Sequence, residues 1–133
     1  MVSGHAHGEG GSGAIVTFTG VVRDNDAGTL SAMEIEHYPG MPEKALSEIA
    51  QQAVTRFDLQ DALVIHRHGR LVPGEQIMMV ATAARHRRSA FEAAEFLMDY
   101  LKSRAPFWKC EITSEGEAWV AAKDEDEAAL NRW

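Results

Sequence analysis

The stretch QIMMVATAARHRRSAFEAAEFLMDYLKSR (76–104) contains, one after the other, the two patterns that decide the fold. Its first part, 76–83, is an apolar run of the kind found in a strand that is buried on both faces. Ser89 and Glu92 then match a helix-capping box, followed by apolar residues at three- and four-residue spacing, so we expect a helix from about 90 to 104. This succession predicts a sheet with a helix packed on it.

Further strands and helices are expected on both sides of this stretch. Alternating or β-branched runs predict strands, and a proline at a first helical turn followed by apolar residues at helical spacing predicts a second long helix. The expected strands are 14–22, 30–38, 62–68, 107–113 and 118–122, and the other expected helices are 42–57 and a short acidic one at 124–132. This order favours an α+β fold, a mostly antiparallel sheet with two main helices packed on it, over parallel α/β winding.

The composition limits the classes of protein to which the chain can belong. Its 133 residues, 45% of them hydrophobic, suit one domain at 14–133 after a glycine-rich segment at 1–13, which we expect to be a flexible tail or a cloning remnant. The net charge of −7 argues against nucleic acid or a membrane as a main partner. A single cysteine, no membrane-length apolar stretch and no signal-peptide pattern indicate a soluble cytoplasmic protein.

Positive charge is concentrated between Arg85 and Lys109, although the chain as a whole is acidic. Six basic and three acidic residues leave this segment with a charge of +3. His86 and Arg87 precede the expected helix, where free backbone N–H groups and the positive end of the helix dipole attract anions and repel cations. Either this cluster is a solvated rim, or an anionic ligand compensates the repulsion between the cations and the helix.

Three other cationic residues are candidates for the same site. Arg23 closes the first strand and suits a grip on phosphate or carboxylate, with a solvated surface position as the alternative. Lys102 falls in the last helical turn, where its charge has a sufficient structural reason. Lys109 stands in an apolar strand, where desolvation would suit it to act as an acid, a base or a nucleophile. Cys110 fits a packed residue better than an activated thiol.

These residues together predict a local site for an anionic small molecule or an acidic peptide end, and the pattern does not fix the reaction. His66 and His68 share one face of a strand, which is compatible with chelation, but no third ligand is evident in the sequence. We therefore expect no metal and no cofactor.

Five segments of the chain closely resemble the large-subunit family of molybdopterin synthases. They are FTGVVR (18–23), EHYPGM (36–41), IHRHGRLVPGE (65–75), HRRSAFEA (86–93) and DYLKSRAPFWKCE (99–111). The last segment is the most specific, because two lysines lie seven residues apart around a Pro-aromatic-Trp sequence. The resemblance implies a hammerhead-like α/β fold and a sulfurtransferase of molybdenum cofactor biosynthesis.

The resemblance also implies a reaction and its partners. A member of this family converts cyclic pyranopterin monophosphate into molybdopterin by inserting two dithiolene sulfurs. The sulfur comes from the C-terminal Gly-Gly thiocarboxylate of a small ubiquitin-like subunit. Two large subunits form a homodimer at the centre of a heterotetramer, and no cofactor is implied.

Nine positions correspond to substrate contacts of the family, and this correspondence rests on the matching motifs. They are Val21, Val22, Arg23, His86, Arg87, Lys102, Lys109, Cys110 and Glu111. Arg23 and Arg87 would hold the phosphate of the substrate in bidentate fashion. His86 would donate to the phosphate or assist proton transfer as the cyclic ester opens.

Lys102 and Lys109 would be the catalytic residues, standing near the thiocarboxylate and the reacting carbons to stabilise negative charge and move protons. Val21 and Cys110 depart from the family pattern, because other members have basic residues at these positions. Two alternatives stay open. One is a noncatalytic module that binds a ubiquitin-like tail, and the other is a phosphate-ester hydrolase with His86 as acid or base and Cys110 as nucleophile.

Overall fold

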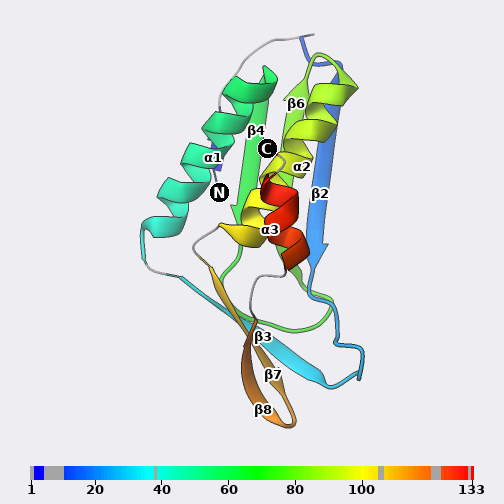
Figure 1. Ribbon diagram of the computed structural model, residues 1–133, viewed down its shortest axis with the longest axis vertical. Coiled ribbons are helices and arrows are strands. Elements are labelled where there is room, and N and C mark those ends of the chain that lie inside the picture. Colours follow the sequence, from blue (N-terminus) through cyan, green and yellow to red (C-terminus); the bar gives the residue numbers. More distant parts are fainter. Residues whose placement is uncertain (1, 5–10, 38, 105–106, 121–123, 132) are drawn as a thin grey trace.

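The computed structural model describes residues 2–4, 11–37, 39–104, 107–120, 124–131 and 133. Its strands form two four-stranded antiparallel sheets, which we call sheet A and sheet B (Figure 1). The order in sheet A is β1 (Val2–Gly4), β4 (Asp61–His66), β6 (Gln76–Ala84) and β2 (Ala14–Val21). The order in sheet B is β5 (Gly69–Leu71), β3 (Leu30–Glu36), β7 (Trp108–Thr113) and β8 (Gly116–Val120). The helices are α1 (Met41–Phe57), α2 (Arg87–Ser103) and α3 (Asp124–Asn131).

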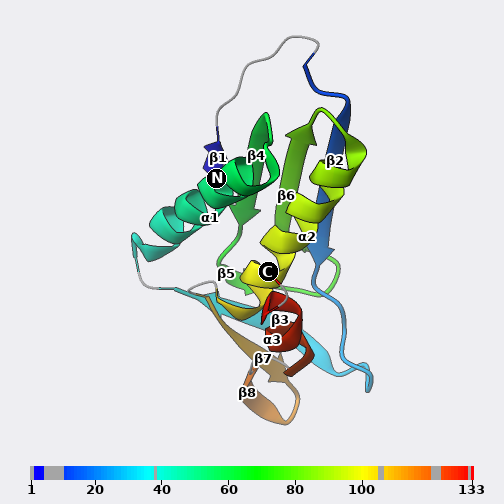
Figure 2. The ribbon, with the colours of Figure 1, turned by 45° about the horizontal axis from the view of Figure 1, so that its top comes forward.

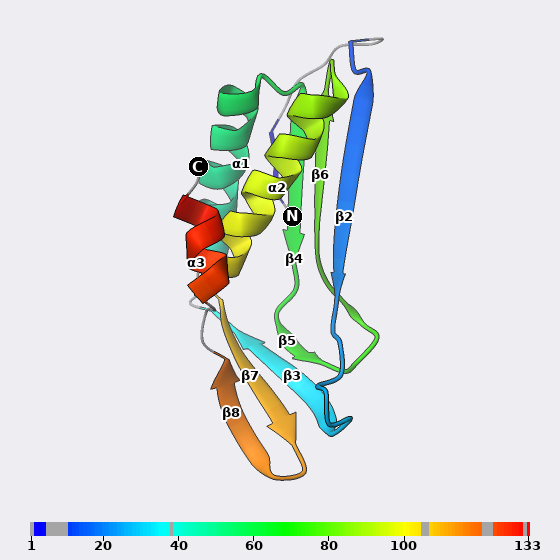
Figure 3. The ribbon, with the colours of Figure 1, turned by 45° about the vertical axis from the view of Figure 1, so that its right-hand side comes forward.

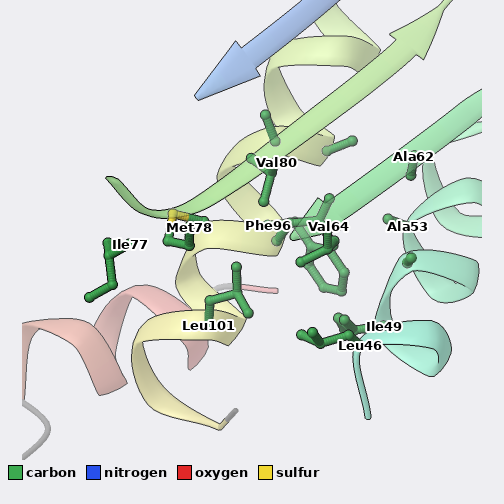
Figure 4. Close-up of a cluster of buried hydrophobic side chains, with 14 of the residues drawn as sticks. Leu46, Ile49, Ala53, Ala62, Val64, Ile77, Met78, Val80, Phe96 and Leu101 are labelled. Atoms are coloured by element: carbon green, nitrogen blue, oxygen red, sulfur yellow. The ribbon is translucent and has the colours of Figure 1, made fainter. Parts of the chain in front are cut away.

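The main hydrophobic core lies between sheet A and the two long helices. α1 and α2 lie side by side on one face of the sheet (Figures 1 and 3). Apolar side chains from the strands and both helices meet there, among them Val64, Val80 and Phe96 (Figure 4). The buried hydroxyl of Thr82 in β6 donates a hydrogen bond of 2.7 Å to the carbonyl oxygen of Ala90 in α2. This bond satisfies a polar group inside the core and ties the strand to the helix.

No helix of the described part of the chain covers the opposite face of sheet A (Figure 3). The strand register and the alternation of side chains place on this open face Ile15, Leu63, Ile65, Met79, Ala81 and Ala83. Ile15 is 72% exposed, and the residues of β6 alternate between buried and half-buried from Met78 onward. The expectation that 76–83 is buried on both faces is therefore wrong, because only the face under the helices is fully buried.

Sheet B lies beyond the end of sheet A at which β2 and β4 end (Figure 2). The chain passes from β2 into β3 through a loop in which the carboxylate of Asp24 accepts a hydrogen bond of 3.0 Å from the backbone N–H of Leu30. All five residues of β8 are exposed, so this strand forms an uncovered edge of sheet B. The predicted antiparallel α+β class is confirmed, although the strands divide into two sheets instead of forming one.

α2 begins earlier than the capping-box pattern predicts. Its first residue is Arg87, and its N-cap is His86, whose backbone is extended and whose side chain makes no capping hydrogen bond. β6 ends at Ala84, so only two residues turn the chain from the strand into the helix. The expected capping-box pair therefore lies inside the helix, where Glu92 forms an ion pair with Arg88 instead. The predicted start at about residue 90 is wrong, because the short connection from the buried strand sets this helix end.

The other long helix begins and ends close to its predicted limits. The expected helix at 42–57 is α1, with Pro42 in its first turn and Gly40 before it at a φ of 82°. A positive φ of this size favours glycine, which lacks the Cβ atom that would be strained there.

Among the described residues, no helix is long and apolar enough to cross a membrane.

Two short strands of the structure, β1 and β5, were not predicted. Val2–Gly4, in the segment expected to be a tail, pairs with β4 as strand β1, while residues 5–10 lie outside the described residues. The short strand β5 was missed because three residues are too few to show a periodicity. Parts of three other predicted elements, at Tyr38, 121–122 and Arg132, also lie outside the described residues.

Candidate functional site

Four elements meet at one end of sheet A, which we call the junction end because sheet B begins there. β2, β4 and α2 end at the junction end, and β7 begins at it (Figures 1 and 3). Arg23 follows the end of β2, Lys102 lies in the last turn of α2 and Lys109 is the second residue of β7. The fold thus brings three of the five principal cationic residues predicted from the sequence to the same end of sheet A.

The chain at the end of β2 is held by its backbone, and this leaves Arg23 accessible. The N–H of Val22 donates to the carbonyl oxygen of Glu75, and the carbonyl oxygen of Val22 accepts from the N–H of Gly74, both at 2.8 Å. The side chain of Val22 is only 3% exposed, whereas Val21 is 52% exposed and Arg23 is exposed. Val22 therefore anchors this segment, and its two neighbours present their side chains to solvent.

The two predicted catalytic lysines differ in their surroundings. Lys102 is exposed, and the negative end of the α2 dipole favours its charge. Lys109 is half-buried in β7, where its register partners are the buried Ile35 of β3 and Val120 of β8. Glu111 shares the face of Lys109, because side chains alternate along a strand. Lys109 is thus the more desolvated of the two.

Cys110 points to the other face of β7 and is buried. Its burial raises the pKa of the thiol above the ordinary value, and the carboxylates of Glu117, Glu36 and Glu34 act in the same direction. A hydrogen bond with the backbone of Ala118 lowers the pKa, by less than burial or Glu117 raises it. Because the thiolate is the nucleophilic form of cysteine, this environment argues against a thiol-dependent hydrolase.

His86 and Arg87 lie at the opposite end of α2 from Lys102 (Figure 3). Fifteen residues at a rise of about 1.5 Å each separate Arg87 from Lys102 by about 22 Å along the helix axis. Both His86 and Arg87 are exposed, whereas the neighbouring Arg88 pairs with Glu92 at 2.8 Å. One chain therefore does not gather all five predicted cationic residues in a single pocket.

A cluster of three histidines and one phenylalanine also lies at the junction end, and the sequence patterns did not indicate it as part of the site. His66 stacks on Phe107 with ring centroids 3.8 Å apart and an interplanar angle of 15°. His37 contacts the edges of His68 and Phe107, with centroids 4.3 Å and 6.1 Å apart. With Pro42, Glu43 and Leu46 of α1, these rings line a small cavity of about 40 Å³. The motifs EHYP, IHRH and APFW contain the aromatic residues, but only the fold brings them together.

A larger hollow of about 530 Å³ lies on the exposed side of α1 and is lined by Glu48, Gln51, Gln52, Thr55 and Arg56. None of these residues belongs to the predicted site, and the hollow is wide open to solvent, so we do not assign it a role. Within the described ranges, no group of three or more histidine, cysteine, aspartate or glutamate residues is arranged to hold a metal ion.

Comparisons with known proteins show which family the chain resembles. A family model described as "MoaE protein" matches residues 2–104. The molybdopterin synthase catalytic subunit of Cereibacter sphaeroides is 70% identical over 128 residues, which cover 96% of this chain and 87% of the relative. The solved structure of the molybdopterin biosynthesis MoaE protein from Burkholderia ambifaria MC40-6 superposes with a TM-score of 0.76 at 55% identity, covering 92% of this chain and 80% of that one. A complex of subunits 1 and 2 of the molybdopterin-converting factor from Helicobacter pylori 26695 has the same fold, with a TM-score of 0.68 at 20% identity over 86% of this chain and 75% of that one.

Proposed function

The chain belongs to the MoaE family of molybdopterin synthase catalytic subunits, and from this premise we propose how its residues carry out the reaction. The substrate is cyclic pyranopterin monophosphate, and the product is molybdopterin. Two dithiolene sulfurs are transferred from the C-terminal thiocarboxylate of a small ubiquitin-like subunit. The observation that carries this proposal is the meeting of Arg23, Lys102 and Lys109 at the junction end in a chain with a net charge of −7.

Each cationic residue has a role that follows from its chemistry and its position. Arg23 presents a planar guanidinium beside an anchored backbone segment, which suits a bidentate grip on the phosphate of the precursor. Lys102 and Lys109 stabilise the negative charge that develops when the thiocarboxylate sulfur bonds to a side-chain carbon of the pterin and the bond from that carbon to an oxygen of the cyclic phosphate breaks. The half-buried position of Lys109 strengthens this interaction, because less water screens its charge. Water then cleaves the acyl–sulfur bond, which leaves the sulfur on the pterin and a carboxylate on the small subunit.

His86 and Arg87 are proposed to act on the site of a second copy of the chain. β2 and α2 both run along sheet A toward the junction end (Figure 1). In a homodimer with a two-fold axis perpendicular to these elements, the second copy runs in the reverse direction. The start of its α2 then lies beside the junction end of the first copy. His86 and Arg87 of the second copy would complete the phosphate grip of Arg23.

The open face of sheet A supports a dimer of this kind. It carries Ile15, Leu63, Ile65 and Met79, and the described part of the chain places no helix over them. An apolar sheet face normally packs against another layer. A second copy of the same chain would supply that layer and, by symmetry, would build two equivalent sites.

The proposal is tested by mixing two impaired variants at a precursor concentration well below the wild-type KM. One chain carries His86→Ala with Arg87→Ala, and the other carries Lys102→Ala. Each variant alone and the mixture of the two are assayed with the thiocarboxylated small subunit and the cyclic precursor. The dithiolene pterin is measured after oxidation to a fluorescent derivative. Random re-pairing of the two chains makes half of the dimers mixed, each with one intact site of two, so we expect about a quarter of the wild-type turnover.

The outcomes separate the proposals. Product from the wild-type chain but none from the mixture would overturn the shared site and leave the synthase activity in place. No product from the wild-type chain, under conditions in which an authentic synthase turns over, would favour the noncatalytic tail-binding module. A control mixture of two preparations of the Lys102→Ala chain should give only the background of that variant.

A further inference from the structure

His66 links the two sheets at the junction end. It is the last residue of β4 in sheet A, and its ring stacks on Phe107, the residue directly before β7 in sheet B. The centroid distance of 3.8 Å and the angle of 15° make this a face-to-face contact. The stack therefore joins the end of a core strand to the start of the strand that carries Lys109.

Phe107 and Lys109 are two residues apart, the spacing that places side chains on one face of an extended chain. His66 therefore approaches the face of β7 from which Lys109 projects. The charge of Lys109 acts on the imidazole of His66, which is a second sign that the two groups are near one another. A displacement of Phe107 would move the backbone that orients Lys109.

The imidazole of His66 is held in one orientation and one tautomer. Its Nδ1 lies 2.7 Å from the carbonyl oxygen of Arg67, and because a carbonyl oxygen can only accept, Nδ1 is the donor. The pKa of His66 is lowered from 6.5 to about 4, mainly by burial; this hydrogen bond opposes the shift, and the charges of Lys109, His37 and His68 add to it. At neutral pH the ring is therefore uncharged and does not repel the lysine.

We propose that His66 is a positioning residue for Lys109, holding the start of β7 in place through its stack on Phe107. This inference rests on the proposed function of Lys109 in sulfur transfer. His66 does not touch the substrate in this account. It acts by fixing where the ammonium group of Lys109 stands, and small displacements of a catalytic group cost large factors in rate.

The test is a double-mutant cycle on the intact complex of large and small subunits. We expect His66→Ala to lower kcat by about ten- to a hundredfold with little change in KM for the cyclic precursor. His66→Phe keeps an uncharged ring over Phe107 and should restore most of kcat. In the Lys109→Ala background, His66→Ala should cause almost no further loss, because the group that it positions is gone.

His68→Ala is the matched control, since His68 is exposed and contacts His37 instead of Phe107. It should keep the wild-type kcat. Circular dichroism and thermal melting show whether each variant is folded, and if His66→Ala is not, His66→Gln takes its place as the variant without a ring.

Two results would overturn the inference in distinguishable ways. An equal loss from His66→Ala in the wild-type and Lys109→Ala backgrounds would mean that His66 acts independently of Lys109, and the proposed function would stand. A wild-type kcat for Lys109→Ala would instead remove the proposed role of Lys109, and the inference about His66 would fail with it.

Discussion

α2 carries Lys102 in its last turn and Arg87 and Arg88 in its first turn, where there is no acidic residue. The helix dipole favours the lysine at the C-terminal end and disfavours the arginines at the N-terminal end. Glu92 offsets the cost for Arg88, but within the described part of the chain Arg87 has no such ion pair. A positive charge thus has a structural reason at the C-terminal end of α2, whereas at the N-terminal end it needs an anionic ligand to compensate it.

The largest expected effect is at the C-terminal end of α2. Lys102→Ala should lower turnover by about 100- to 1000-fold, the usual effect of losing one electrostatic group that stabilises a transition state. The free energy of unfolding should fall by only about 0.3–1 kcal/mol, because only a dipole interaction is lost. Turnover is measured with the reconstituted complex, and stability by urea unfolding. A variant that unfolds at 25 °C would show that the residue is structural after all.

The next effect tests the N-terminal end, where activity and stability should change in opposite directions. Arg87→Ala should raise KM for the cyclic precursor by about ten- to a hundredfold, the loss expected for one charge-assisted hydrogen bond. The free energy of unfolding should rise by about 0.3–1 kcal/mol, because a cation leaves the positive end of the helix. Arg88→Ala is the control, with KM near the wild-type value. If Arg87→Ala destabilises the chain and leaves KM unchanged, Arg87 has a structural role and does not bind the precursor.

A third prediction concerns the pH dependence of stability at the junction end. In the unfolded chain an imidazole takes up a proton near pH 6.5, whereas His66 in the folded chain does so only near pH 4. Between these values the unfolded state binds more protons, so the contribution of His66 is complete above pH 6.5 and is lost as the pH falls toward 4. The loss should be on the order of 3 kcal/mol by pH 4.

The measurement is urea unfolding of the wild type and of His66→Phe between pH 7 and pH 4.5. The variant should lack the part of the pH dependence that belongs to His66. The groups that face this ring are Lys109 from β7, His37 after β3, His68 after β4 and Glu43 from α1, and the variant leaves all of them unchanged. Identical pH profiles for the two proteins would contradict the prediction.

The smallest expected effect is at Cys110, which is next to Lys109 in β7 but faces the other way. Cys110→Ser should leave kcat near the wild-type value, because burial keeps the thiol protonated and unreactive. The buried hydroxyl should lower the free energy of unfolding by about 1–3 kcal/mol. A folded but inactive serine variant would restore the thiol-dependent mechanism as an alternative.

Most of the local structure, and the family, could be predicted from the sequence alone. Apolar spacing predicted the limits of α1 to within one residue, because a helix that packs on a sheet repeats its apolar side chains every three or four positions. The strands 14–22 and 76–83 were predicted from a β-branched run and an apolar run, and the structure has them as Ala14–Val21 and Gln76–Ala84. The motifs around Lys102 and Lys109 sufficed to identify the family, which the comparisons then showed.

Which of the candidate residues lie close together follows only from the tertiary structure. Arg87 and Lys102 are near in sequence, but a rigid helix holds them at its opposite ends, whereas Arg23 and Lys109 are far apart in sequence and reach the same end of sheet A. The stack of His66 on Phe107 could not be predicted from the sequence either, because it depends on where β4 ends and β7 begins. Sequence patterns report which face of an element is apolar, and they do not report where the ends of different elements meet in space.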